Sequence, residues 1–266
     1  MSPTAGTASP RAAEAGLNDR QQRILELVRA TGYASIESLA EAFAVSAQTV
    51  RRDMTRLDDL GLLQRFHGGA GLPEDSVRLS YRQKLGIAVA AKTRIGAAAA
   101  ALVPDGASIY LDVGTTAEAV AEALLPRRLT AVYTNSMGAA AILARAQGME
   151  TYVTGGQVRG ADGSLVGAGA TAMLAGIAVD VAVIGCSGFA ADGGATDFDL
   201  QKVAVKQAAL KHARLALLVA DAGKFARHAV VRIAPPGRFA RLVTDSAPPD
   251  ALAQALAAAG TEIVLG

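Results

Sequence analysis

The stretch SAQTVRRDM (residues 46–54) places two adjacent arginines between an apolar residue, Val50, and another, Met54. On a helical wheel of about 100° per residue, Val50, Met54 and Leu57 fall on one side and form an apolar stripe. The opposite side carries polar and cationic side chains: Gln48, Thr49, Arg51, Arg52, Thr55 and Arg56. The pattern predicts an amphipathic helix, capped by Ser46, that exposes a hydrogen-bonding and cationic surface in its first two turns.

Two further helices are predicted before this one. The first begins near Asp19 and repeats apolar residues at helical spacing, and the second follows the N-cap candidate Ser35. Only a short turn around Ala44 and Val45 separates the second helix from the third. A helix that follows another through a short turn and exposes Arg, Gln and Thr at its N-terminal end is typical of a helix-turn-helix, whose second helix enters the major groove. The alternative interpretation is the solvated face of an ordinary core helix.

The segment LLQRFHGGA (62–70) favours the DNA-binding interpretation. Arg65 and His67 alternate along an extended stretch, and Gly68 and Gly69 are suited to a tight hairpin turn. A helix-turn-helix followed by a basic hairpin is a winged helix, in which arginines contact guanine edges or phosphates. The predicted DNA-binding residues are Ser46, Gln48, Thr49, Arg51, Arg52, Thr55, Arg65 and His67.

Composition limits the other possibilities. The chain has 266 residues and a net charge of +2, which is too small to indicate a nucleic acid partner without the local pattern. One cysteine, Cys186, excludes an intramolecular disulfide and is consistent with a reducing cytoplasm. No apolar run reaches the ~20 residues of a membrane span. We expect a disordered tail over 1–18, the winged helix over 19–72, a linker over 73–80 and a second domain over 81–266.

Helical and strand patterns alternate in this second domain. Short apolar runs, including SIYLDV, LTAVYTN, METYVT, VDVAVIG, RLALLVAD, ARLVTD and EIVLG, are separated by helical segments. Such alternation predicts an α/β fold with a mostly parallel sheet covered by helices. Ligands of these sheets bind at the carboxyl ends of the strands.

Small and polar residues gather at those strand ends. Gly114, Thr115 and Thr116 follow the first strand at a helix start, where free amides, two hydroxyls and the helix dipole suit a phosphate. The predicted ligand-binding residues are Asp112, Gly114, Thr115, Thr116, Thr134, Asn135, Ser136, Gly155, Gly156, Gly185, Lys206 and Lys224, the two lysines supplying countercharge. An ordinary helix cap is the alternative role for the Gly-Thr-Thr segment.

Both halves resemble one family. The VS-x-x-TVRRD core, the L-x-x-LGLL segment and R-x-HGGA resemble the DNA-binding domain of DeoR-type bacterial transcription regulators. LDVGTT, VYTNS, VTGGQVR, SLVG, D-x-AVIGCSG, TDFDL, VKQAA and the D-x-x-KF of 221–225 are similar to the sensor domain of that family. The resemblance implies a Rossmann-like sensor fold similar to ribose-5-phosphate isomerase, and a repressor of sugar catabolism genes controlled by a phosphorylated sugar. In one departure, Gln201 stands where the family commonly has an acidic residue before Lys206.

Rival functions need residues that the sequence does not clearly supply. A sugar-phosphate isomerase fused to a DNA-binding segment would need a carboxylate base, for which Asp112, Asp180 and Asp221 are candidates. A pure scaffold protein would not need the exposed arginines. The three histidines are scattered, so we expect neither a metal nor another cofactor. The sequence therefore predicts a cytoplasmic, non-enzymatic regulator that binds operator DNA and a phosphorylated sugar as a homodimer or higher oligomer.

Overall fold

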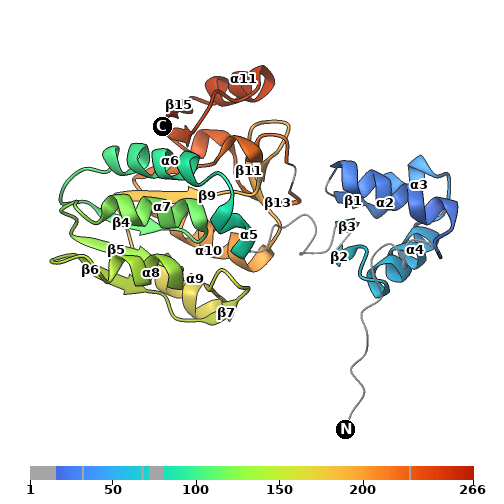
Figure 1. The fold of residues 1–266 in the computed structure, drawn as a ribbon, viewed down its shortest axis with the longest axis horizontal. Helices are drawn as coiled ribbons and strands as arrows, with labels where there is room; N and C mark the ends of the chain where they lie inside the picture. The colour runs from blue at the N-terminus through green and yellow to red at the C-terminus, as the bar shows by residue number, and fades with distance from the viewer. Residues whose placement is uncertain (1–15, 32, 67–68, 72–80, 228) are drawn as a thin grey trace, which may run out of the picture. The chain divides into compact units, whose positions relative to one another are not determined.

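The computed structural model describes residues 16–31, 33–66, 69–71, 81–227 and 229–266. The chain divides into two compact units, residues 1–80 and 81–266 (Figure 1). The predicted tail lies mostly, and the predicted linker entirely, outside the described residues, as does His67.

The first unit contains three helices and a small antiparallel sheet in its described part. The helices are α2 (Asp19–Thr31), α3 (Ile36–Ala42) and α4 (Ala47–Asp59). Strands β1 (Tyr33–Ser35), β2 (Gln64–Phe66) and β3 (Gly69–Gly71) pair in the order β1-β3-β2. Ser35 and Ser46 cap α3 and α4 as predicted, since each hydroxyl accepts from a first-turn amide. The winged-helix prediction is confirmed.

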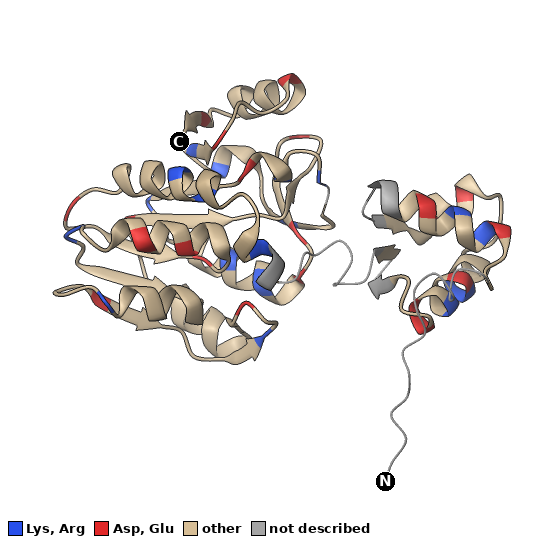
Figure 2. Cartoon of the chain, viewed as in Figure 1, with Lys and Arg blue, Asp and Glu red and all other residues tan. Residues whose placement is uncertain are grey.

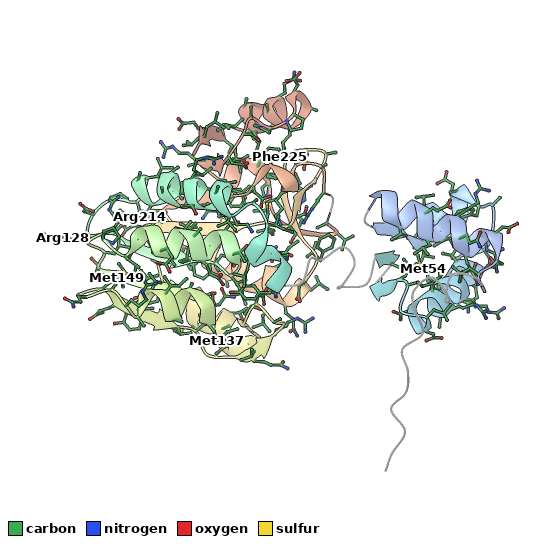
Figure 3. All side chains as sticks on the ribbon, in the orientation of Figure 1. Met54, Arg128, Met137, Met149, Arg214 and Phe225 are labelled. Carbon is green, nitrogen blue, oxygen red and sulfur yellow. The ribbon has the colours of Figure 1, made fainter. Side chains whose placement is uncertain are left out.

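Helices α2, α3 and α4 bury one shared apolar core. Ile24, Leu39, Val50 and Leu57 are at most 1% exposed. Met54 lies among these helices in Figure 3 and is 1% exposed. This core depends on the helical spacing seen in the sequence, because residues three and four apart fall on one face.

The second unit is built on a seven-stranded parallel sheet. Its order is β15-β14-β12-β9-β4-β5-β6, with parallel pairing throughout. The strands are β4 (Ser108–Leu111), β5 (Ala131–Thr134), β6 (Glu150–Val153), β9 (Val181–Gly185), β12 (Leu215–Val219), β14 (Arg241–Thr244) and β15 (Glu262–Leu265). All seven correspond to apolar runs predicted as strands, so the α/β prediction is confirmed.

Helices cover both faces of this sheet. On one face lie α6 (Val89–Ala101), α7 (Thr115–Leu124) and α8 (Met137–Leu143), which Figure 1 shows in front of the strands. On the other lie α9 (Ala168–Ala175) and α10 (Leu200–Lys211). A six-residue helix, α5 (Tyr81–Gly86), begins the unit, and α11 (Asp250–Ala258) precedes the last strand. Side chains alternate along β4. Ile109 and Leu111 therefore pack in the core between the sheet and α6, α7 and α8, and Tyr110 packs in the core between the sheet and α9 and α10.

Several short elements were not predicted from the sequence. They are the hairpin of β7 (Gln157–Arg159) and β8 (Ser164–Val166) and a sheet of β10 (Gly188–Phe189), β11 (Ala195–Asp197) and β13 (Val231–Ala234). Two 3-10 turns, η1 (Ala222–Lys224) and η2 (Pro236–Arg238), complete the described elements.

Candidate functional site

Helix α4 separates its two faces as the sequence predicts. Val50, Met54 and Leu57 are buried, whereas Gln48, Arg51 and Arg52 are exposed. Figure 2 shows basic residues on α4, in blue. The guanidinium groups are therefore available to an external partner at the end of the helix that would enter a DNA groove.

Three hydroxyl residues of the predicted DNA-binding set also have local roles. Ser46 Oγ accepts from Thr49 N at 3.2 Å and lies 2.9 Å from Thr49 Oγ1. Thr55 Oγ1 donates to Arg51 O at 2.8 Å. Because each hydroxyl oxygen retains acceptor capacity, these bonds position the side chains without excluding a further contact.

Asp53 is a residue of this motif whose role the sequence analysis missed. It lies on the buried face of α4, where its Oδ2 accepts from Arg20 Nε at 2.6 Å and its Oδ1 from Gln21 Nε2 at 3.0 Å. Both partners belong to α2, so the carboxylate ties the recognition helix to the first helix. The signal was available, because an acid between Val50 and Met54 on an apolar stripe needs a buried partner.

The predicted wing is present, with one correction to its turn. Strands β2 and β3 pair antiparallel, and Phe66 is the partner of Gly69. Gly69 therefore belongs to β3, and the connection is residues 67–68, not Gly68 and Gly69 as expected. Arg65 lies in β2, and β3 also pairs with β1, which fixes the wing to the rest of the unit.

The second unit has a topological switch point between β4 and β9. Strands β4, β5 and β6 are joined through α7 and α8 on one face, and the chain then returns through α9 on the other face to β9. Neighbouring strands whose connections leave to opposite faces open a crevice at their carboxyl ends. Asp112 follows β4 and Gly185 ends β9, so both lie at this point.

An ion cluster occupies the carboxyl ends of these two strands. Lys206 Nζ of α10 donates to Asp112 Oδ2 and, at 2.9 Å, to Gly185 O, and it lies 3.4 Å from Asp197 Oδ2. Gly185 N donates to Asp112 Oδ2 at 2.9 Å. Burial alone would lower the pKa of Lys206, but the charges of Asp112 and Asp197 outweigh it and raise the pKa. Lys206 therefore remains a cation that its own neighbours neutralise.

Thr134, Asn135 and Ser136 form the buried end of β5. Asn135 Oδ1 accepts from Tyr110 Oη at 2.8 Å, and Asn135 Nδ2 donates to Leu165 O at 3.2 Å. Ser136 Oγ caps α8 by accepting from Ala139 N at 3.1 Å. Each of the three is 0% exposed, so in this conformation they shape the strand end and hold β8 against it. Their contact with a ligand stays a prediction.

The start of α7 has the geometry expected of an anion site. Gly114 is its N-cap residue with φ 118°, a conformation that favours glycine, and it forms no side-chain cap. A Cβ atom at Gly114 would meet nothing within 4 Å. Thr115 and Thr116 are half-buried at the first two helical positions. Free first-turn amides and the positive end of the helix dipole thus lie beside two hydroxyls.

Lys224 and Cys186 lie close to the ion cluster. Among the described residues, Lys224 is in no ion pair, although it is half-buried. Burial lowers its pKa, and the nearby charge of Asp221 offsets only part of this effect. Burial also raises the pKa of the Cys186 thiol to about 12, so Cys186 is an unreactive thiol at neutral pH. An added anion nearby would therefore stabilise the charged form of Lys224.

The glycines after β6 lie at the rim of this region. Gly155 and Gly156 are exposed, and Gly156 has φ 128°. A Cβ atom at Gly156 would clash with Val166 O, so the loop passes close to β8. No described contact joins these glycines to Lys206 or Lys224, and their ligand role stays a prediction.

Two further ion pairs lie near the predicted site. Arg159 Nε donates to Asp199 Oδ2 at 2.6 Å, and Lys202 Nζ donates to Asp162 Oδ2 at 2.5 Å. Both join the β7–β8 hairpin to the start of α10. Gln201 is exposed at the second position of α10. The buried partners of Lys206 are Asp112 and Asp197.

The aspartates considered as catalytic bases have other roles. Asp180 lies before β9, at the amino end of the sheet, and its Oδ2 accepts from Ser108 N at 2.9 Å. Asp221 Oδ1 accepts from Gly223 N at 3.1 Å at the start of η1. Asp112 is 0% exposed and bound to Lys206. Asp180 is therefore excluded from the strand-end site, a correction to its candidacy.

The described residues contain neither a candidate metal site nor a candidate membrane span. Within that part of the chain, no group of three or more His, Cys, Asp or Glu side chains is arranged to hold a metal ion. No helix described by the structure is long and apolar enough to span a bilayer.

Comparisons with known proteins cover both units. Residues 20–76 match the model of the DeoR-like helix-turn-helix domain, and residues 87–246 match the model of the DeoR C terminal sensor domain. The glycerol-3-phosphate regulon repressor of Escherichia coli (strain K12) is 35% identical over 237 residues, covering 89% of this chain and 94% of that protein. The protein of the same description from Haemophilus influenzae is 37% identical over 229 residues, covering 86% and 89%.

Two other similarities concern a regulator and a solved structure. The HTH-type transcriptional repressor CsqR of Escherichia coli (strain K12) is 36% identical over 248 residues, covering 93% of this chain and 95% of that protein. Ribose 5 phosphate isomerase A from Neisseria gonorrhoeae aligns over 52% of this chain and 54% of its own, with 18% identity and a TM-score of 0.36. The three relatives named here that share most of the chain are described as repressors.

Proposed function

Because the chain belongs to the DeoR family of transcriptional regulators, we propose that it represses genes for the use of glycerol phosphate or a related sugar phosphate. Binding of that compound to the second unit releases the protein from operator DNA. Two relatives named as glycerol-3-phosphate regulon repressors, 35% and 37% identical to this chain, support this choice of compound. The protein acts in the cytoplasm, where such metabolites and the operator are found.

The exposed face of α4 supports the DNA-binding half of the proposal. Arg51 and Arg52 point away from the core while Val50, Met54 and Leu57 hold the helix in place. Arginine forms bidentate bonds with guanine, and Gln48 is suited to adenine. One short helix contacts too few base pairs to select a site in a genome, so we propose that a homodimer or higher oligomer binds two half-sites.

The start of α7 supports the effector-binding half. A phosphate placed there accepts bonds from first-turn amides and from the hydroxyls of Thr115 and Thr116. The three nearby lysines differ in their partners. Lys206 is neutralised by Asp112 and Asp197, and Lys92 Nζ is bound to two carbonyls, whereas Lys224 has no ion pair among the described residues. The observation that carries the proposal is Lys224, half-buried and in no ion pair among the described residues, in the strand-end region that also holds the start of α7.

Removal of the two hydroxyls tests this placement. We expect the double variant Thr115→Ala, Thr116→Ala to bind operator like the parent and to lose several-fold or more in effector affinity. The reason is that hydrogen bonds to a charged group are worth about 1.5–3 kcal/mol. Fluorescence anisotropy of labelled operator, titrated with sn-glycerol 3-phosphate and then with other sugar phosphates, measures both properties. Release of the double variant at the parent's effector concentration would place the phosphate elsewhere.

A further inference from the structure

Helix α5 is the first element of the second unit along the chain. Residues 1–80 form the DNA-binding unit, and Tyr81 begins both α5 and the sensor domain. Any change that reaches the DNA-binding unit through the backbone therefore passes through α5. Figure 1 labels α5 near the helices of the front layer, and the contacts given below fix its place.

The first contact joins α5 to the helix that carries the proposed phosphate site. Tyr81 Oη donates to Glu118 Oε1 at 2.8 Å. Burial and this hydrogen bond raise the pKa of Tyr81 to about 12, so the phenol keeps its proton at neutral pH. Glu118 is 7% exposed and lies on α7, three residues after Thr115. Side chains three apart on a helix are neighbours, with Cβ atoms about 5–6 Å apart.

The start of α8 backs this contact closely. A Cβ atom added at Gly138 would clash with Glu118 Oε1 and would lie 3.5 Å from Tyr81 Oη. The carboxylate therefore has little space in which to move away from Tyr81. Burial raises the pKa of Glu118, an effect that the bond from Tyr81 partly offsets, so an additional negative charge nearby would be costly.

A second contact connects α5 to the lysines of the same region. Lys92 Nζ donates to Lys84 O and to Ile87 O, both at 2.6 Å, and so binds one carbonyl in the last turn of α5 and one just after the helix. The pKa of Lys92 is lowered, first by burial and also by the charge of Lys224, while Asp221 and Glu118 act in the opposite direction. The start of α5 is therefore bound to Glu118, and its last turn is bound to Lys92, whose pKa the charge of Lys224 helps to lower.

We infer that Tyr81 and Glu118 are positioning residues of the effector response, through which occupancy of the α7 site changes the placement of α5. This inference rests on the proposed function. A phosphate at Thr115 and Thr116 repels the ionised Glu118 carboxylate one turn away and weakens its bond with Tyr81. The Tyr81–Glu118 contact then belongs to the effector-free, operator-binding state, and its loss favours release. Effector shifts the equilibrium because it binds the two states unequally.

Tyr81→Phe tests the contact by removing one hydroxyl. We expect its operator affinity without effector to fall about three- to tenfold, the range for the net loss of one hydrogen bond. In the parent, sn-glycerol 3-phosphate at about 10 mM, a concentration chosen to saturate even a weak site, weakens operator binding further. This further loss of affinity should be smaller in Tyr81→Phe than in the parent by a similar factor. Tyr152→Phe is the matched control, because Tyr152 Oη donates to Glu150 Oε2 at 2.6 Å on the edge strand β6, away from α5. The control should behave like the parent in both measurements.

Glu118→Gln separates the charge from the hydrogen bond. The amide oxygen still accepts from Tyr81, but the repulsion of phosphate is gone. We expect operator binding within about twofold of the parent and equal or tighter binding of sn-glycerol 3-phosphate, measured by calorimetry, with at least about threefold less release from operator. If Glu118 served only to stabilise the fold, its substitution would change the melting temperature without separating effector affinity from release of the operator.

The outcomes distinguish the inference from the proposed function. If the parent fails to bind operator or fails to release it with any sugar phosphate, the proposed function is wrong. If the parent responds but Tyr81→Phe has parental operator affinity and release, the inference is wrong. Parental release by Glu118→Gln would also overturn it, because the charge would then play no part.

Discussion

Asp53 offers a sharp test of how the recognition helix is held in place. Its side chain is 6% exposed, and its oxygens accept from Arg20 Nε at 2.6 Å and from Gln21 Nε2 at 3.0 Å. Asp53→Ala removes both bonds. The Arg20 side chain is 35% exposed, so solvent screening limits the value of that ion pair to about 1 kcal/mol or less. Gln21 is 5% exposed, and its orphaned amide costs a further ~1–3 kcal/mol.

The expected destabilisation of the DNA-binding unit is therefore about 1–4 kcal/mol. For a unit of roughly 60 residues each kcal/mol lowers the melting temperature by about 4–8 °C, so a drop of at least ~4 °C is expected. Differential scanning calorimetry of the full chain should show this in one transition only, because the sensor domain has separate cores. Operator binding near the lowered transition should fall in parallel. Asp53→Asn, which keeps one acceptor oxygen, should lose about half as much.

Asp59→Ala is the matched control for this prediction. Asp59 is an exposed acid at the last position of the same helix, and surface substitutions usually change stability by no more than about 0.5 kcal/mol. The explanation would be refuted if Asp53→Ala and Asp59→Ala melted within about 2 °C of each other, the shift expected of ~0.5 kcal/mol or less.

Two other predictions concern the DNA face and the buried ion cluster. Arg52→Ala should weaken operator binding by about 1–3 kcal/mol and relax the preference at one base pair. Fluorescence anisotropy with systematically altered operators measures this preference, and equal weakening for every operator sequence would contradict the prediction. Lys206→Met should destabilise the sensor domain by about 3–5 kcal/mol, because Asp112 and Asp197 lose their counterion, and adding Asp112→Asn should recover part of that loss. Independent, additive losses from the two substitutions in chemical denaturation would argue against the cluster.

Patterns with a short period were readable from the sequence. The stripe of Val50, Met54 and Leu57 located α4 and its exposed face, and apolar runs located the seven strands of the parallel sheet. Motifs of known spacing identified the DeoR family, and the family models confirm it. Strands such as β1 and β7 have only three residues each, too few to show an alternation.

Contacts between distant residues were not readable in the same way. The ligand contact predicted for Lys206 stays a prediction, whereas its bond to Asp112, which is 94 positions away, was not foreseen. Asp53 and Gln21 are 32 positions apart. A single sequence gives the residue type at each position but not the pairing, which depends on how strands and helices are ordered. Asp180 shows the same limit, because it precedes its strand and the chain direction places it at the opposite edge of the sheet from the site.

The ion cluster also gives a physical reason to expect no isomerisation at the proposed effector site. An enediol mechanism needs a carboxylate that is free to take a proton from a carbon atom of the substrate. Asp112 is placed at the strand ends where such a base would act, but it is 0% exposed and accepts bonds from Lys206 and from Gly185 N. These bonds hold the Asp112 carboxylate in place, so it is not free to approach a carbon atom of the substrate. The same arrangement fixes the carboxyl ends of β4 and β9 against α10, next to the phosphate site proposed at the start of α7.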